Sequence, residues 1–237
     1  SDFVATVQDC STSAAEVATL TKEYRMEYPS VIGSLIYLLN SRPDICFAVS
    51  KLAKFMRSPG RKHFQALVHL LQYLKCHRRL GIKYYHDYKN SPIYSYLREH
   101  GTEIKDEIFG MHDSSWQDCP DTGRSTGCYF NFIAGGIVDF SSFVPAPVAL
   151  SSTEAEMNAG AVGGMGMSYV RMLWNDLHGE DTDILWDPPI SIFCDNTGAV
   201  TFANSDKDSK ALRHTKRRMF FMRQSRKEKE LQYFFID

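Results

Sequence analysis

The segment IFGMHD, residues 108–113, sets the pattern of the C-terminal half of the chain, because a short apolar run there ends on an aspartate. A second short run, ISIFCD at residues 190–195, ends in the same way. Such runs are typical of buried strands, and functional groups of α/β sheets gather in the crevice at the carboxyl ends of strands. We therefore expect Asp113 and Asp195 to lie at one crevice of a sheet.

The sequence around these runs predicts the rest of a mixed α/β sheet. Runs at 127–133 and 136–143 flank Gly135-Gly136, which is typical of a hairpin turn. Residues 152–178 predict a long helix, which begins with an N-cap serine and early acids but is weakened by four glycines. The remaining predicted elements are a short helix at 197–203, a basic helix at about 211–229 and a strand at 231–236.

The N-terminal half predicts helices. Residues 1–28 show little periodicity, and we expect an extended lead-in there. Over residues 29–80 we expect a bundle of three amphipathic helices joined by short breaks, and over 81–107 a linker with short strands, before an α/β domain at 108–237. The helical apolar stripes run through residues 31–39, 45–56 and 64–74.

Composition and charge restrict the classes of protein. The net charge of −1 conceals two basic blocks, at residues 42–89 and 207–229, around an acidic middle at 90–206. This pattern suits an enzyme that binds a polyanion and holds a metal with carboxylates, although solvated helix faces are an equal explanation. The six cysteines show no regular spacing, so we expect a reducing compartment and no structural zinc site. No run is apolar enough to insert into a membrane.

A third acid completes a potential metal site. Glu156 lies in the first turns of the predicted long helix, from which it can reach the two strand ends. Three carboxylates meeting at one point would bind Mg²⁺ or Mn²⁺, which prefer oxygen ligands. Each acid by itself is better explained by a turn or by the helix dipole. The prediction therefore depends on all three together.

Four sequence words resemble the ribonuclease H domain of copia-type LTR retrotransposon polyproteins. These words are, in order, FGMHDSSW (109–116), GRSTGCYFNFIAGG (123–136), VALSSTEAEM (148–157) and IFCDNTGAV (192–200). Residues 28–75 resemble the thumb-like helices that follow the reverse-transcriptase palm in the same polyproteins. The resemblance extends over roughly residues 25–236. It implies a ribonuclease H-like fold, divalent-metal dependence and an RNA/DNA hybrid as substrate.

The resemblance also implies roles for individual residues. Asp113 matches the first catalytic and metal-binding aspartate of the family, Glu156 the glutamate, and Asp195 the second aspartate. Glu154 is the competing choice for the glutamate. His112, beside Asp113, we interpret as a neighbour of the magnesium site rather than a ligand.

The chain departs from the family pattern at several positions. Ser115 and Lys216 each stand where the family has an acid. The family's fourth carboxylate follows the last strand, and Asp237 does not match it in context. The polymerase motif Tyr-x-Asp-Asp is absent. We therefore expect a piece of a longer polyprotein, without the fourth acid, or a domesticated remnant.

Several residues are candidates for nucleic-acid contacts. Asn196 is placed to contact a 2′-hydroxyl, although a turn role is equally plausible. His214 is a candidate for assisting proton transfer or product release. Basic side chains of the bundle and of the C-terminal basic helix are expected to contact phosphates. The full set of candidates is Lys54, Arg61, Lys62, Asn196, His214, Lys216, Arg217 and Arg218.

Three functional hypotheses follow. The first is a metal-dependent endoribonuclease domain of a reverse transcriptase, which hydrolyses the RNA of RNA/DNA hybrids beside the rest of the polyprotein or a host assembly. The second is a catalytically inactive, domesticated module that serves as a structural or binding subunit. The third is an integrase-like strand transferase, which the words around the acids disfavour. For each we expect an intracellular location: cytoplasm, a virus-like particle, or an organelle if domesticated.

Overall fold

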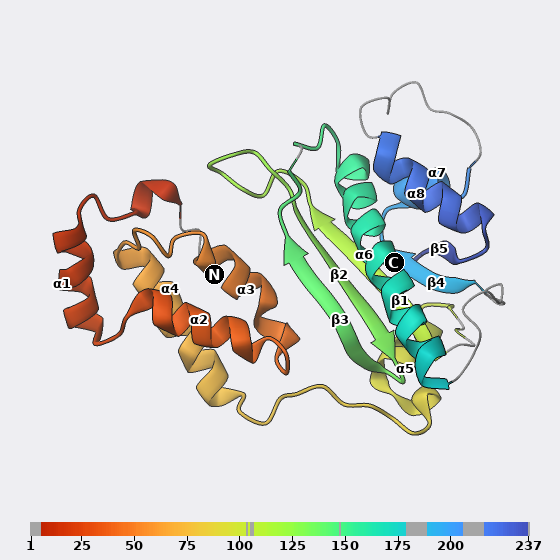
Figure 1. The fold of residues 1–237 in the computed structure, drawn as a ribbon, viewed down its shortest axis with the longest axis horizontal. Coiled ribbons are helices and arrows are strands. Elements are labelled where there is room, and N and C mark those ends of the chain that lie inside the picture. Colours follow the sequence, from red (N-terminus) through yellow and green to blue (C-terminus); the bar gives the residue numbers. More distant parts are fainter. Residues whose placement is uncertain are drawn as a thin grey trace. The chain divides into compact units, whose positions relative to one another are not determined.

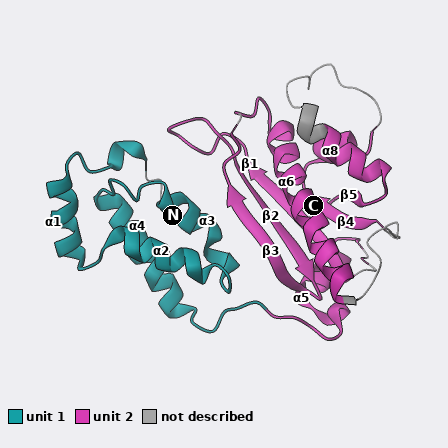
Figure 2. Cartoon of the chain, in the orientation of Figure 1, with its two compact units in different colours: residues 1–82 teal, residues 83–237 magenta. Residues whose placement is uncertain are grey.

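The computed structural model describes residues 6–102, 104, 107–146, 148–178, 189–205 and 216–236, without the side chains of 178 and 216–219. The chain divides into two compact units, residues 1–82 and 83–237 (Figure 2). Each unit has its own hydrophobic core. The units are therefore described separately.

The N-terminal unit is a bundle of helices. A single core joins them, built around fully buried side chains such as Tyr28, Ile32, Phe64 and Leu67. Burying an aliphatic or aromatic side chain of this kind contributes about 1.5–3 kcal/mol. The elements are η1 (Val7–Asp9), α1 (Ala14–Tyr24), α2 (Tyr28–Leu38), η2 (Pro43–Ile45), α3 (Cys46–Ala53) and α4 (Arg61–Cys76).

Helix α1 corrects the prediction of an extended lead-in. Ser13 caps this helix by accepting a hydrogen bond from the Glu16 amide at 3.2 Å, and the Glu16 carboxylate accepts one from the Thr12 amide at 2.9 Å. Leu20 is buried in the same core as the three predicted helices. The bundle thus has one more helix than expected, and the sequence pattern Ser-x-x-Glu at 13–16 was a recognisable start signal.

The C-terminal unit is a mixed α/β structure around a five-stranded sheet, and it is compatible with a ribonuclease H-like fold (Figure 1). The strand order is β3-β2-β1-β4-β5. The first three strands pair antiparallel, whereas β4 runs parallel to β1 and β5 parallel to β4. The strands are β1 (Ile108–Ser115), β2 (Thr126–Ile133), β3 (Gly136–Phe143), β4 (Ile190–Cys194) and β5 (Leu231–Phe235). The mixed α/β class predicted from the sequence is confirmed.

Helices cover both faces of this sheet. On one face lie α6 (Ser152–His178), α7 (Thr197–Ala203) and α8 (Lys216–Lys227). On the other lies α5 (Pro92–Glu99), which follows the short η3 (Tyr88–Asn90). None of the described helices is long and apolar enough to cross a bilayer.

Strand β1 shows how the two faces are built. Ile108 belongs to the core under α6, whereas Phe109 and Met111 pack into the core on the α5 side. Because side chains alternate along a strand, His112 returns to the α6 face, where its ring lies against Gly160. Strand β4 follows the same rule, with Cys194 on the α6 face.

The glycines of α6 allow the helix to approach the sheet closely. A Cβ added at Gly160 would lie 2.7 Å from Nε2 of His112, and one at Gly163 would lie 2.9 Å from Cβ of Tyr129. A Cβ at Gly166 would meet Oδ2 of Asp139 at 2.5 Å. These glycines lower intrinsic helix propensity, but α6 still runs unbroken over the 27 residues from Ser152 to His178. Close packing of α6 on the sheet therefore explains these glycines, which in the sequence alone only lower the helix propensity.

The short strands expected within the linker 81–107, at residues 82–85 and 93–97, are wrong. Residues 93–97 are part of helix α5, not a strand, because Pro92 occupies its first turn and the buried Tyr94 and Leu97 are spaced helically. Residues 82–85 form no strand either. Of the predicted basic helix at 211–229, residues 216–227 are helical, and 206–215 lie outside the described residues.

Candidate metal centre and active site

The candidate site lies where β1 and β4 end side by side. These strands run parallel, and Met111 is paired with Phe193. Two residues further along the chain from this pair lie Asp113, within β1, and Asp195, directly after β4; they reach the same edge of the sheet, and both side chains are exposed. The parallel pairing thus brings together two aspartates that are far apart in sequence.

Glu156 completes the cluster from α6. One carboxylate oxygen from each of Asp113, Glu156 and Asp195 lies within 4.8 Å of the others. Glu156 is only 3% exposed, so the cluster has one buried and two exposed acids. Three carboxylates at this separation supply hard oxygen ligands for a divalent cation such as Mg²⁺ or Mn²⁺.

Ser114 fixes the position of Glu156. Oε1 of Glu156 accepts hydrogen bonds from the amide of Ser114 at 2.8 Å and from its hydroxyl at 2.6 Å. Hydrogen bonds to a charged group contribute more than neutral ones, about 1.5–3 kcal/mol. Sequence reasoning missed this residue. Strand alternation was the available signal, because it places Ser114 on the same face as His112, towards α6.

The electrostatics of the site favour a cation. The pKa of Asp113 is raised, first by desolvation and then by the negative charges of Glu156 and Asp195. Like charges in close proximity disfavour one another's ionised form. A divalent cation bound among the three acids would relieve this repulsion, so the donor set fits the metal that the sequence implies.

Glu154, the competing choice for the glutamate, has a structural position instead. Its Oε2 accepts a hydrogen bond from the Leu150 amide at 2.9 Å, and its own amide bonds the hydroxyl of Ser151 at 3.1 Å. It is therefore directed back to the loop before α6. Among the described residues, the carboxylate cluster contains Glu156 and not Glu154.

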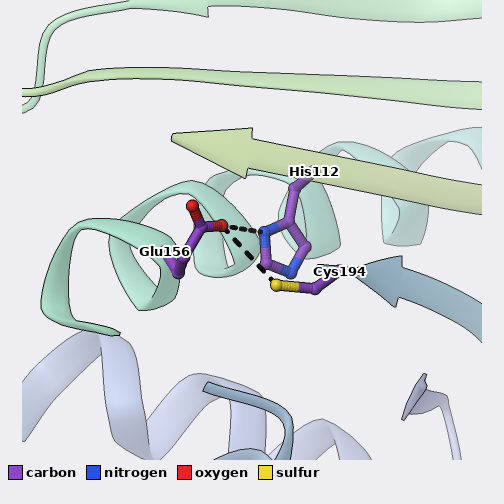
Figure 3. Close-up of side chains that lie close together, drawn as sticks. All are labelled: His112, Glu156 and Cys194. Carbon is purple, nitrogen blue, oxygen red and sulfur yellow. Dashed lines mark hydrogen bonds and ion pairs between the residues drawn. The ribbon is translucent and has the colours of Figure 1, made fainter. Parts of the chain in front are cut away.

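A second group of side chains shares Glu156 with the carboxylate cluster, and Figure 3 shows this second group. His112 from β1, Glu156 from α6 and Cys194 from β4 are all buried and face one another. The Cys194 thiol donates to Oε2 of Glu156 at 3.5 Å, and Nδ1 of His112 lies 3.4 Å from the same oxygen. Burial, with the negative charge of Glu156, raises the pKa of the Cys194 thiol. Nothing in the sequence pattern alone indicates a role for Cys194.

The predicted nucleic-acid contacts are distributed over both units. Asn196 caps α7 by accepting from the Ala199 amide at 3.0 Å, so its turn role is present and its 2′-hydroxyl contact stays a prediction. Arg61 pairs with Glu23, and Lys62 pairs with Asp9 at 2.8 Å. Lys54 is exposed at the end of α3. The side chains of Lys216, Arg217 and Arg218 lie outside the described residues, as does all of His214.

Comparison with known proteins identifies the relatives of this chain. It is 31% identical over 174 residues, 73% of its length, to the "Retrovirus-related Pol polyprotein from transposon RE1" of Arabidopsis thaliana. It is 29% identical over 174 residues to the corresponding RE2 polyprotein of the same plant. The "Retrovirus-related Pol polyprotein from transposon TNT 1-94" of Nicotiana tabacum is 26% identical over 91% of the chain. The homologues of this chain are thus retrovirus-related Pol polyproteins of transposons.

This assignment agrees with the copia-type resemblance seen in the sequence words. The Pol-related chain spans about a tenth of the length of the RE1 and RE2 polyproteins, and 14% of that from TNT 1-94. A scan of protein-family models finds no match to it. The chain is therefore a retrotransposon-derived segment that corresponds to one part of much longer proteins.

Proposed function

We propose that the C-terminal unit is a ribonuclease H-type endonuclease domain, which hydrolyses the RNA strand of RNA/DNA hybrids with Mg²⁺ or Mn²⁺. The observation that carries this proposal is the convergence of Asp113, Glu156 and Asp195 from β1, α6 and the end of β4. Similarity to retrovirus-related Pol polyproteins of transposons supports it, because the sequence motifs resemble the ribonuclease H domain of such polyproteins. The three acids are also those that the sequence words single out.

The residues of the site have distinct tasks in this proposal. The exposed Asp113 and Asp195 would bind the cation on the side that a scissile phosphate can reach. The buried Glu156 would supply the third carboxylate ligand. When bound, divalent cations activate a water and stabilise the leaving oxygen in phosphodiester hydrolysis. Ser114 keeps Glu156 in the ligating position through its two hydrogen bonds.

The basic residues would supply sequence-independent contacts to phosphates. Lys54 is exposed, and the exposed Arg61 and Lys62 form ion pairs that a phosphate could displace, because ion pairs at the surface are weak and screened by salt. The basic segment around α8 would add further charge. Binding of hybrid should therefore weaken steeply as the salt concentration rises. In the organism, we expect the domain to act beside the other parts of a Pol polyprotein.

The test is cleavage of end-labelled RNA in an RNA/DNA hybrid, with RNA/RNA, DNA/DNA and single-stranded RNA as parallel substrates. The full chain with Mg²⁺ or Mn²⁺ should cleave the hybrid, and Asp113→Asn should lose at least about a hundredfold in rate, since metal stabilisation of the transition state amounts to several kcal/mol. Asp176→Asn, at an exposed acid of α6, is the matched control and should retain full activity.

The alternatives predict different results. An inactive, domesticated module would show no cleavage, or equal background cleavage in the wild type and in Asp113→Asn. A strand transferase would act on ends of duplex DNA in preference to the hybrid. Either result would overturn the nuclease assignment.

A further inference from the structure

Hydrolysis at the carboxylate site gives no role to His112 and Cys194, which form a buried group with Glu156. The three side chains are 4%, 3% and 1% exposed, and they come from β1, α6 and β4. Three different elements thus place an imidazole, a carboxylate and a thiol together inside the protein. One ligand atom of each lies within 4.8 Å of the others.

The imidazole of His112 is buried without a hydrogen bond from the described residues. Within the part of the chain that the structure describes, neither ring nitrogen of this buried histidine has a hydrogen-bond partner, and Nδ1 lies at ion-pair distance, 3.4 Å, from Oε2 of Glu156. A buried polar group without a hydrogen bond costs about 1–3 kcal/mol. The glycine at position 160 leaves room for the ring, since a Cβ there would lie 2.7 Å from Nε2. The fold therefore accommodates an imidazole whose nitrogens lack a hydrogen-bond partner.

The distances match the edges of a tetrahedral zinc site. With zinc bonds of about 2.0–2.2 Å to nitrogen or oxygen and about 2.3 Å to sulfur, tetrahedral N···O and O···S edges are about 3.3–3.6 Å and 3.5–3.7 Å. The observed separations from Oε2 of Glu156 are 3.4 Å to Nδ1 of His112 and 3.5 Å to Sγ of Cys194. Two of the three separations thus match the edges of a site that holds one ion, and the ligand atoms of His112 and Cys194 lie within 4.8 Å of each other.

We propose that His112, Glu156 and Cys194 form a second metal site, for Zn²⁺ or a similar borderline-soft divalent cation, which shares Glu156 with the carboxylate site. Mixed nitrogen, sulfur and oxygen ligands select zinc over magnesium. The shared Glu156 also lies next to the exposed Asp113 and Asp195, with one carboxylate oxygen of each within 4.8 Å of the others. On binding, a metal–sulfur bond forms and the thiol proton leaves to the solvent.

Sharing of Glu156 links the two sites. An ion held by His112 and Cys194 would draw the Glu156 carboxylate away from Asp113 and Asp195, so zinc would compete with magnesium. The binding of zinc itself does not depend on the proposed nuclease function. It is measurable in a chain whose carboxylate site has been disabled.

The test uses Co²⁺ as a spectroscopic probe of the zinc site in the full chain, under reducing conditions. Coordination by a cysteine thiolate gives a sulfur-to-cobalt charge-transfer band in the near ultraviolet, which carboxylate ligands cannot produce. We expect this band to saturate at one Co²⁺ per chain and to disappear on addition of Zn²⁺. Cys194→Ser should abolish the band. His112→Ala should weaken Co²⁺ affinity by at least about tenfold, since even outer-shell changes cost that much.

Two control variants make the outcome specific. Cys76→Ser, at the exposed cysteine of α4, should leave the band unchanged. Asp113→Asn should also leave it unchanged while removing hybrid cleavage, which separates failure of this proposal from failure of the nuclease assignment. Absence of the band in the wild type overturns the proposal whether or not the variants fold. Persistence of the band in a folded Cys194→Ser protein overturns it as well.

Discussion

Replacement of Gly160 by alanine tests whether the close approach of α6 to β1 holds the site together. In an ordinary helix this change stabilises by about 1 kcal/mol, because alanine is the better helix former. At Gly160 the new Cβ would lie 2.7 Å from Nε2 of His112, 2.9 Å from its Cε1 and 3.0 Å from Cε of Met222. Overpacking of a buried contact costs about 1–3 kcal/mol. We expect a net destabilisation of about 1–2 kcal/mol.

Gly33 in α2 is the matched control. A Cβ at Gly33 meets no atom within 4 Å, so Gly33→Ala should stabilise its own unit by up to about 1 kcal/mol. The same chemical change is therefore expected to have opposite signs in two helices.

Urea unfolding can separate the two units. All three tryptophans, at positions 116, 174 and 186, belong to residues 83–237, so tryptophan fluorescence follows the C-terminal unit. Gly160→Ala should lower the urea midpoint of the fluorescence transition by about half to one molar. Gly33→Ala should raise stability in circular dichroism without moving that transition. If Gly160→Ala stabilises the C-terminal unit, the close helix–sheet packing is refuted.

Three further predictions follow from single contacts. Ser114→Ala removes the 2.6 Å hydrogen bond to Glu156 and should reduce hybrid cleavage about tenfold or more, whereas Ser115→Ala at an exposed position should not; equal rates would contradict the anchoring role. The pKa of Asp113 is higher in the folded chain than in the unfolded chain. Ionisation of Asp113 at neutral pH therefore lowers the stability of the metal-free folded state. Asp113→Asn should therefore unfold at higher urea than the wild type at pH 7, and the difference should vanish as the pH falls to about 4, below which the aspartate is protonated in both states. Asn196→Ala should lose about 0.5–2 kcal/mol of stability through loss of the α7 cap, and Asn196→Asp should restore it, both followed by fluorescence.

The sequence predicted most of the sheet and the convergence of its acids. Strands that end on aspartates, with parallel pairing between β1 and β4, bring Asp113 and Asp195 together through local pattern and a general rule for α/β sheets. The choice between Glu154 and Glu156 required the structure. Both lie in the first turn or two of α6, and only the side-chain directions show that Glu154 bonds back to Leu150.

Other features depend on contacts between distant segments. From the sequence alone, the glycines of α6 indicate only a low helix propensity. In the structure, Gly160 and Gly163 face His112 and Tyr129 on the sheet. In the sequence, Cys194 is indistinguishable from an ordinary strand residue, because the side chains beside it come from β1 and α6. Helix α1, in contrast, was recognisable from its capping residues, although only Leu20 of its side chains is fully buried.

The most direct test of the account is the effect of Mn²⁺ or Mg²⁺ on the stability of the C-terminal unit, followed by tryptophan fluorescence during urea unfolding. A ligand that binds only the folded state stabilises it by about 2.7 kcal/mol at a hundred times its Kd. We expect such a gain for the wild type and its loss in Asp195→Asn. An equal gain in both proteins, or none in the wild type, would contradict the claim that Asp113, Glu156 and Asp195 hold a common cation.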